Sequence, residues 1–186
     1  MQLYIKNMVC NRCILVVRQE LDKLNIRYRD IALGEAEVED ETPKEQIQKL
    51  SNNLDAIGFE LLDDSKQQLI EKIKNAIIKH VHYNEDDSLH NFSAILSEKL
   101  HRDYSYLSNL FSEVERITIE KYIINQKIEK VKELIIYDQL SLSEIAYKVG
   151  YSSVAHLSAQ FKKVTGLTPS HFKQVSQNKR KPLDEI

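Results

Sequence analysis

Two stretches of this sequence resemble each other. Segment 92–111 (FSAILSEKLHRDYSYLSNLF) aligns with segment 142–161 (LSEIAYKVGYSSVAHLSAQF) at an offset of 50 residues. In both copies apolar residues recur every three to four positions on either side of a short break, which predicts a helix, a tight turn and a second helix. Segment 118–137, between the copies, is predicted to be one long helix. The repeat therefore predicts two helix-turn-helix units joined by a helix.

Helices are predicted for almost all of the chain after residue 64. An apolar stripe runs through 69–81, and short helices are expected at 91–100, 104–114, 142–148, 153–164 and 169–175. Gly150 and Gly166 fall at expected helix ends. The acidic segment 84–88 is predicted to be a loop, and the residues after Val175 a polar, frayed tail.

The first 64 residues follow a different pattern. Apolar and polar residues alternate in half-buried strands predicted at 2–7, 26–33, 36–39 and 59–62. One helix is expected from Asn11, and a second with Thr42 as N-cap and Pro43 as its first residue. The order β-α-β-β-α-β is that of a ferredoxin-like fold. The predicted architecture is an α+β ferredoxin-like domain at 1–64, an all-α double helix-turn-helix domain at 65–178 and a polar tail at 179–186.

Composition excludes several classes of protein. Of 186 residues, 42% are apolar and 29% are charged, which is typical of globular proteins. No apolar run approaches the roughly 18 residues that a membrane span needs, so no membrane partner is expected. The N-terminal residues do not resemble a signal peptide, which predicts a cytoplasmic protein. Because the sequence shows no Ser-His-Asp grouping, phosphate loop or catalytic carboxylate pair, an enzyme is not expected.

The net charge of −2 is divided unevenly along the chain. Residues 1–64 hold 8 Lys/Arg and 13 Asp/Glu, a net charge of −5, whereas 65–186 hold 18 and 15, a net charge of +3. Within that second part, 141–181 hold seven basic residues and one acid, a net charge of +6. This asymmetry indicates separate modules with separate partners.

Both cysteines lie at one predicted junction of a strand and a helix. Cys10 and Cys13 are about one helical turn apart, and a helix N-terminus stabilises a thiolate through its free N–H groups. Two such thiolates satisfy linear Cu(I), whereas Zn²⁺ needs further ligands. In a reducing compartment the pair indicates metal binding or redox chemistry. A loose cluster of His80, His82 and His90 is interpreted as solvated linker histidines.

The residues around the cysteines carry a family resemblance. Segment 8–13 (MVCNRC) resembles the Met-x-Cys-x-x-Cys loop of heavy-metal-associated (HMA) domains in copper chaperones and copper-transporting ATPases. Segment 55–59 (DAIGF) resembles the stretch before the last strand of those domains. The resemblance implies that the two cysteines bind Cu(I) or another soft metal ion, that Met8 is buried and that Phe59 shields the site. Asn7 stands where that family usually has glycine.

The second copy of the repeat carries another resemblance. A helix-turn-helix binds DNA by placing its second helix in the major groove, braced by the first. Segment 141–173 resembles the signature of the AraC/XylS family of transcription regulators. The apolar, glycine, proline and polar positions that match are Ile145, Ala146, 149–153, His156, Leu157, 161–163, Thr165, Gly166, Thr168 and Pro169. With the first unit included, the resemblance covers 66–175 and implies a double-stranded DNA partner.

The residues expected to contact DNA follow from the two faces of the second unit's second helix. Leu157 and Phe161 lie four apart and are predicted to be buried, which leaves the opposite face for DNA. The predicted contacts are Ser152, Ser153, Val154, Ala155, His156, Ala159, Lys162, Lys163 and Lys173. Of these, one of the serines is the expected helix cap and the lysines are expected to contact phosphates. The first unit is predicted to add Ser105, Ser108 and Asn109.

The first unit is nevertheless acidic. Residues 85–138 hold 7 Lys/Arg and 11 Asp/Glu, a net charge of −4. Asp103, Glu113 and Glu115 lie in or beside its predicted second helix, where carboxylates repel phosphates. The second unit is therefore predicted to supply most of the DNA affinity.

These features together predict a sequence-specific DNA-binding transcription regulator that responds to a soft metal ion at Cys10 and Cys13. The expected partners are double-stranded DNA, RNA polymerase and a second copy of the chain. Two alternatives stay open. One is a metallochaperone that passes its ion to a partner domain and does not bind DNA, and the other is a regulator switched by a Cys10–Cys13 disulfide.

Overall fold

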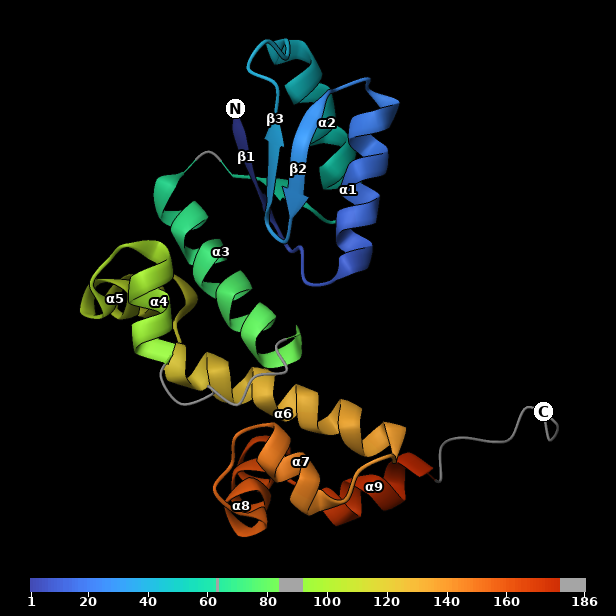
Figure 1. The fold of residues 1–186 in the computed structure, drawn as a ribbon, viewed down its shortest axis with the longest axis vertical. Helices are drawn as coiled ribbons and strands as arrows, with labels where there is room; N and C mark the ends of the chain where they lie inside the picture. Colours follow the sequence, from blue (N-terminus) through green and yellow to red (C-terminus); the bar gives the residue numbers. More distant parts are fainter. Residues whose placement is uncertain (63, 84–91, 178–186) are drawn as a thin grey trace, which may run out of the picture.

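A computed structural model describes residues 1–62, 64–83 and 92–177 of the chain. A small sheet with two helices lies at one end of an elongated molecule, and helices make up the rest (Figure 1). Among the described residues, no helix is both long and apolar enough to cross a membrane. The predicted acidic loop at 84–88 and the tail at 179–186 lie outside the described residues.

The N-terminal part is a four-stranded antiparallel sheet with two helices. Its elements are β1 (Gln2–Lys6), α1 (Asn11–Lys23), β2 (Tyr28–Ala32), β3 (Glu35–Val38), α2 (Lys44–Ala56) and β4 (Glu60–Leu61). The strand order across the sheet is β2-β3-β1-β4, with Leu3 opposite Ala36 and Ile5 opposite Leu61. The alternation seen in the sequence therefore marks real strands, although the last strand covers only two residues.

One face of this sheet is buried under α1 and α2. Leu3 and Ile5 of β1 pack with Leu21 of α1 and Leu50 of α2 in a common apolar cluster. Because side chains alternate along a strand, Tyr4 lies on the opposite face. That opposite face meets the helical part of the molecule.

The predicted start of α2 is wrong by a short distance. Thr42 does not cap the helix: its hydroxyl donates to the carbonyl oxygen of Glu39 at 2.7 Å. Pro43 occupies the N-cap position and Lys44 is the first helical residue. Thr42 instead closes the turn before the helix, since a threonine hydroxyl bonds nearby backbone as readily as a helix end.

Helix α3 (Ser65–Ile78) connects the sheet to the helical part. Asp64 caps it, because its carboxylate accepts from the backbone N–H groups of Lys66 and Gln67. Lys72 of α3 donates to the hydroxyl of Tyr4 at 3.0 Å. Gly34, in the turn between β2 and β3, lies so close to α3 that an added Cβ would meet the Asn75 side chain at 1.9 Å. The Asn75 side chain could move aside, but the φ of 83° at Gly34 favours glycine in any case.

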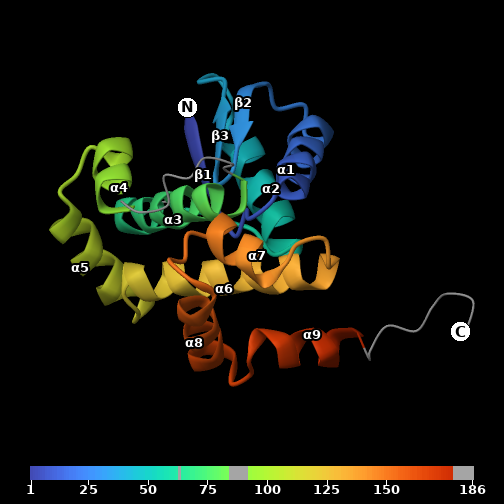
Figure 2. The ribbon, with the colours of Figure 1, turned by 60° about the horizontal axis from the view of Figure 1, so that its bottom comes forward.

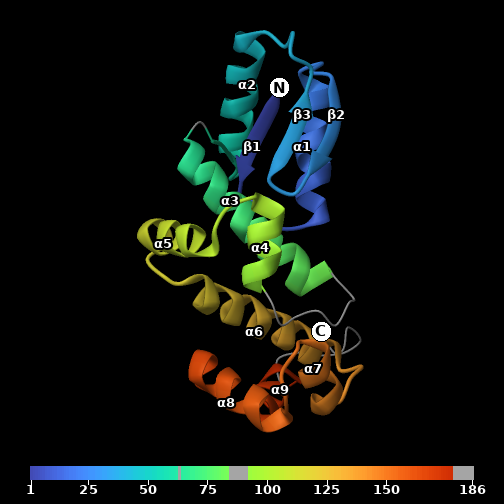
Figure 3. The same ribbon diagram turned by 60° about the vertical axis from the view of Figure 1, so that its left-hand side comes forward.

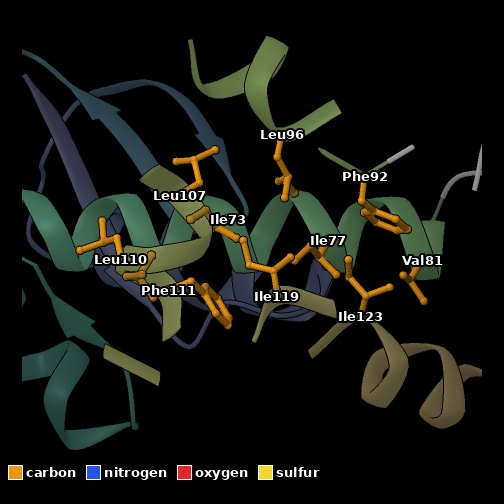
Figure 4. Close-up of a cluster of buried hydrophobic side chains, with 12 residues drawn as sticks. Ile73, Ile77, Val81, Phe92, Leu96, Leu107, Leu110, Phe111, Ile119 and Ile123 are labelled. Carbon is orange, nitrogen blue, oxygen red and sulfur yellow. The ribbon is translucent and has the colours of Figure 1, made fainter. Parts of the chain in front are cut away.

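The first helix-turn-helix unit consists of α4 (Phe92–Leu100) and α5 (Tyr104–Glu115). Its apolar residues pack against α3 and the start of α6 (Ile119–Tyr137) in one cluster (Figure 4). Leu107 and Phe111 of α5 are fully buried there, with Ile73 of α3 and Ile119 of α6. The sequence prediction of this unit is confirmed within a residue at each helix end.

The second unit consists of α7 (Leu142–Lys148) and α8 (Val154–Thr165), followed by α9 (Pro169–Gln177). It has a separate apolar cluster, in which Ile128 and Val131 of α6 pack against Leu157 and Phe161 of α8. Helix α6 runs from the first unit to the second (Figure 2), and the second unit lies at the opposite end of the molecule from the sheet (Figure 3). One helix thus contributes to two cores.

The interpretation of the linker histidines as solvated is wrong for His80. It lies in a π-helical turn, η1 (Lys79–Tyr83), and is buried, with its ring edge-on to Phe92 at 5.0 Å between centroids. His82 is half-buried and shares a hydrogen bond of 3.0 Å with Gln126 of α6. His90 lies outside the described residues. The continuation of α3 by η1 carries both described histidines into the helical core.

Candidate nucleic-acid interface and thiol site

The turn of the second unit is set by local backbone chemistry. Gly150 adopts a φ of 73°, a left-handed conformation that suits glycine. The Tyr151 N–H then donates to the Ala146 carbonyl at 2.8 Å, which ends α7. Ser153 caps α8, because its hydroxyl accepts from the His156 N–H at 3.1 Å. Ser153, not Ser152, is therefore the helix cap.

The buried face of α8 is the one predicted from the sequence. Leu157 and Phe161 are fully buried, together with Ile145 and Ala146 of α7. Phe161 also packs edge-on against Phe172 of α9, with 5.5 Å between ring centroids. These contacts fix the rotation of α8 about its axis and so decide which side chains face outward.

The opposite face of α8 is open to solvent. Ala155, His156 and Ala159 are exposed there, as are Ser152 and Ser153 at the start of the helix. Lys162 and Lys163 are exposed in the last turn. Val154 is different, since it is half-buried and packs against the apolar cluster of the second unit. It was predicted to face outward, but its place at the first helical position turns it partly toward the core.

A bracket of aromatic and basic side chains supports His156. The Tyr151 and His156 rings are perpendicular with 5.2 Å between their centroids, and the Ser152 hydroxyl and His156 Nδ1 are 3.1 Å apart. Lys127 of α6 places its ammonium 5.6 Å from the centroid of the Tyr151 ring. Burial raises the pKa of Tyr151 to about 12 and lowers the pKa of Lys127. The sequence analysis missed Lys127, because 24 residues separate it from Tyr151 and only the fold brings the two together.

Lys173 does not point freely toward a ligand. Its ammonium forms an ion pair with the carboxylate of Asp138, the residue that follows α6. Both side chains are partly exposed, so the pair is a weak one by the usual measure of surface ion pairs. The predicted phosphate contact would therefore have to compete with Asp138.

The first unit presents a related but different surface. Asp103 caps α5 by accepting from the Ser105 and Tyr106 N–H groups. Ser105 and Asn109 are exposed, and Ser108 is half-buried. The left-handed residue of its turn is His101, with a φ of 50°, where the second unit uses Gly150. The connection between the two helices is also shorter than in the second unit, with 101–103 in place of 149–153.

The acids of the first unit have separate roles. Glu115 pairs with Lys74 of α3 at 2.7 Å, and Lys74 also reaches Glu71 at 3.1 Å. Burial acts to lower the pKa of Lys74, but its bonds to the two carboxylates outweigh this and leave the pKa raised. Asp103 is committed to the helix cap, whereas Glu113 is exposed. Some of the acidic residues of the first unit thus form contacts within the protein.

The two cysteines lie together at the start of α1. Cys10 is the N-cap residue, its sulfur is 3.5 Å from that of Cys13, and both are half-buried and free. A hydrogen bond from the Cys13 backbone is the largest of the effects that lower the pKa of Cys10. Met8 is buried beneath the loop, and Asn7 takes a left-handed φ of 72°. Asparagine tolerates that conformation better than most residues do.

The thiol loop touches the helical part of the molecule through Tyr83. The Tyr83 hydroxyl donates to the Val9 carbonyl at 3.3 Å. Burial raises the pKa of Tyr83, and the nearby Cys10 and Cys13 raise it further. No cluster of three or more possible metal ligands occurs among the described residues. A metal at this loop would be held by the two sulfurs, which suits a soft ion such as Cu(I) better than Zn²⁺.

Comparison with known proteins agrees with the helical part of this description. The helix-turn-helix domain family matches residues 96–174. The Msm operon regulatory protein of Streptococcus mutans is 31% identical over 83 residues, which are 45% of this chain and 30% of that protein. The melibiose operon regulatory protein of Escherichia coli is 26% identical over 156 residues, covering 75% of this chain and 51% of that protein. The chain thus spans about half or less of these relatives' length.

The helical part of the chain also resembles a solved structure. The C-terminal domain of AraT, a response regulator from Geobacillus stearothermophilus, shares 25% sequence identity with this chain. The two superpose with a TM-score of 0.50 over 60% of this chain and 88% of that domain. The double helix-turn-helix seen here is therefore an arrangement already known in a response regulator. The resemblance of residues 1–64 to HMA domains stays a prediction.

Proposed function

We propose that this chain, whose residues 96–174 form an AraC-type helix-turn-helix domain, is a DNA-binding transcription regulator. The observation that carries the proposal is the outward face of α8. Its exposed residues combine two small side chains, Ala155 and Ala159, with His156 and two lysines, Lys162 and Lys163. Small side chains allow a helix to approach the major groove closely, and lysines neutralise the phosphates on its walls.

In this proposal α8 enters the major groove and α7 braces it. His156 faces the base edges, and Tyr151 together with Ser152 holds its ring in place. Lys162 and Lys163 contact backbone phosphates. The first unit adds a second, weaker set of contacts through Ser105, Ser108 and Asn109. RNA polymerase and a second copy of the chain are further partners of such a regulator.

The DNA proposal is tested on a duplex selected from a random pool by the wild-type protein. Lys162→Gln/Lys163→Gln should weaken binding by about tenfold or more and lower the slope of log affinity against log salt by roughly 2. Lys44→Gln/Lys49→Gln removes the same charge from exposed residues of α2 and should change neither quantity appreciably. Equal losses in the two variants would contradict the role of α8.

We further propose that the N-terminal part is a ferredoxin-like, HMA-type domain that senses a soft metal ion through Cys10 and Cys13. Cys10 and Cys13, whose sulfur atoms lie 3.5 Å apart, would hold the metal, which would link the two sulfurs. The Tyr83–Val9 contact favours this regulatory role, because it joins the thiol loop to η1, next to His82 and its bond to Gln126 of α6. A change in the loop would then reach the helix shared by both units.

The regulatory proposal is tested by measuring duplex affinity with and without Cu(I) in three proteins. The wild type should respond to Cu(I), and Cys10→Ser/Cys13→Ser should neither bind Cu(I) in chelator competition nor respond. Tyr83→Phe should bind Cu(I) normally but respond less, because it loses the hydroxyl that contacts Val9. An unchanged response in the double cysteine variant would contradict the metal role.

The same experiment separates the alternatives. A response to oxidant but not to Cu(I) indicates a disulfide switch. Cu(I) binding without any salt-dependent DNA binding indicates a metallochaperone.

A further inference from the structure

A cleft of about 900 Å³ lies between the sheet and the helices that pack against it. Its walls come from the sheet around the turn between β2 and β3, from the start of α1, from α3 with η1, and from the end of α4 with the turn that follows. This volume is within the range of small-molecule sites in proteins. None of the residues expected to contact DNA lines it.

The helical walls of the cleft are basic. Lys72 and Lys79 come from the α3 side, and Lys99 and Arg102 come from the first unit. Lys72 is held in place by the Tyr4 hydroxyl, with its ammonium 4.4 Å from the centroid of the Tyr4 ring. Four cations, from α3, η1, α4 and the turn that follows α4, thus line one space.

The acids that line the cleft do not balance these cations. Glu71 is bound to Lys74, whose other partner is Glu115. Asp30 and Glu35 lie on the sheet side. Within the described residues, no ion pair joins either of them to the four cations, and Glu35 instead accepts from the Gln2 amide at 3.3 Å.

Two of the cations repel each other. Partial desolvation and then the charge of Lys79 lower the pKa of Lys99, and Glu35 only partly offsets this. Like charges held close together favour the binding of an anion between them, because it removes their repulsion and satisfies their N–H donors. Tyr4, Tyr83 and Asn75 line the same cleft. The Tyr4 hydroxyl accepts from Lys72 and keeps its own O–H as a donor, and the Asn75 amide has N–H donors, whereas the Tyr83 hydroxyl already donates to Val9.

We propose that this cleft binds a small anionic molecule, with its phosphate or carboxylate group between Lys79 and Lys99 and its polar body along Tyr4 and Asn75. Such a ligand contacts the sheet, α3 and the turn of the first unit at the same time. It therefore bridges the two parts of the molecule at a site that does not include Cys10 or Cys13, although Asn11 and Tyr83, which adjoin the thiol loop, line it. The proposal concerns binding alone and does not depend on the DNA-binding function.

The test is a calorimetric titration of the full chain, without DNA, with inorganic phosphate, citrate, glucose 6-phosphate and glucose. At least one of the anions should bind saturably at millimolar concentration or below, and glucose should not. Comparison of citrate with the phosphates shows which anionic group the site prefers. Lys79→Gln/Lys99→Gln should weaken binding by about tenfold or more. Arg102→Gln, which removes an exposed side chain, serves as a second variant if the first does not fold.

A matched control distinguishes this cleft from the basic face of α8. Lys162→Gln/Lys163→Gln removes the same charge and should leave anion binding unchanged. In ¹⁵N-labelled protein the anion should shift the amide signals of Gly34 and Ala76 but not those of Ala155 and Ala159. Absence of saturable binding by every anion, or loss of binding only in the α8 variant, would overturn the proposal.

Discussion

The two helix-turn-helix units share one backbone plan and differ in charge. Helices α5 and α8 begin and end at positions that differ by the 50-residue offset, and each has an N-cap side chain and a left-handed C-cap residue. Yet where the second unit has Ser153, Lys162 and Lys163, the first has Asp103, Ser112 and Glu113. The shared residues are apolar and buried, whereas the differing residues lie at the helix cap and on the outward side.

This difference shows that buried and outward positions of the repeat have different roles. The buried positions maintain the helix-turn-helix, and Phe111 and Phe161 are fully buried at equivalent places. The outward positions decide how strongly each unit meets a polyanion. In the first unit one acidic residue of α5, Glu115, instead forms an ion pair with Lys74 of α3. The first unit is thus an internal contact of the protein, in addition to the DNA contacts proposed for it.

The largest expected effect concerns the independence of the two cores. Phe111→Ala and Phe161→Ala should each lower the free energy of unfolding by about 3–5 kcal/mol, because each leaves a cavity in a fully buried cluster. Amide hydrogen exchange should show the loss mainly in α3–α5 for the first variant and in α7–α9 for the second. Equal loss in both units from either variant would break the comparison and show that α6 couples the cores. Ala159→Ser, on the exposed face of α8, is the control for a change that leaves the core intact.

A smaller effect is expected from giving the first unit the residues of the second. Asp103→Ser/Ser112→Lys/Glu113→Lys keeps a capping side chain and changes the net charge by +4. Duplex affinity should rise by about tenfold, and the salt slope by roughly 2, because two new lysines reach phosphates.

The control for this transplant places the same charge elsewhere. Glu41→Lys/Glu45→Lys also adds +4, at exposed residues beside and within the first turn of α2. If both variants gain affinity equally, overall charge rather than the position of the first unit explains the gain. A gain confined to the transplant places α5 at the DNA.

The smallest effect is a dependence of stability on pH that comes from one bond at the first unit, between Tyr104 of α5 and Glu120 of α6. The Tyr104 hydroxyl donates to Glu120 at 2.5 Å, and this bond lowers the pKa of Glu120. A lowered pKa stabilises the fold above the ordinary glutamate pKa of about 4, and the stabilisation is lost as pH falls through the lower, folded-state value. The second unit has Ser170 at the equivalent position, so it lacks this carboxylate.

Tyr104→Phe isolates that contribution. It should lower the free energy of unfolding by less than about 1 kcal/mol at neutral pH, since the glutamate is exposed, and the difference from wild type should shrink in acid. Urea unfolding at a series of pH values measures it. A difference that stays constant down to pH values below the glutamate range would show that packing of the ring, not the hydrogen bond, is responsible.

Much of the local structure could be predicted because it follows from patterns within a few residues. The spacing of Leu157 and Phe161 placed the buried face of α8, and Gly150 placed its turn. The sequence left the cap open between Ser152 and Ser153, and the structure shows that it is Ser153. Thr42 and His80 could not be placed in this way. The Thr42 hydroxyl could bond either to the N–H groups at the start of α2 or to the carbonyl of Glu39, and the structure has the second bond. At His80, η1 continues α3 where the sequence suggested a solvated linker.

The sequence by itself determined the two helix-turn-helix units, the strands and helices of the small sheet part and the uneven distribution of charge, because periodicity and composition are local properties. Only the tertiary structure decided which charged side chains form ion pairs within the protein. It committed Glu115 to Lys74 and Lys173 to Asp138, and it gathered Lys79 and Lys99 beside one cleft. These groups are brought together by helices that pack across the chain, and no spacing along the sequence encodes their distances.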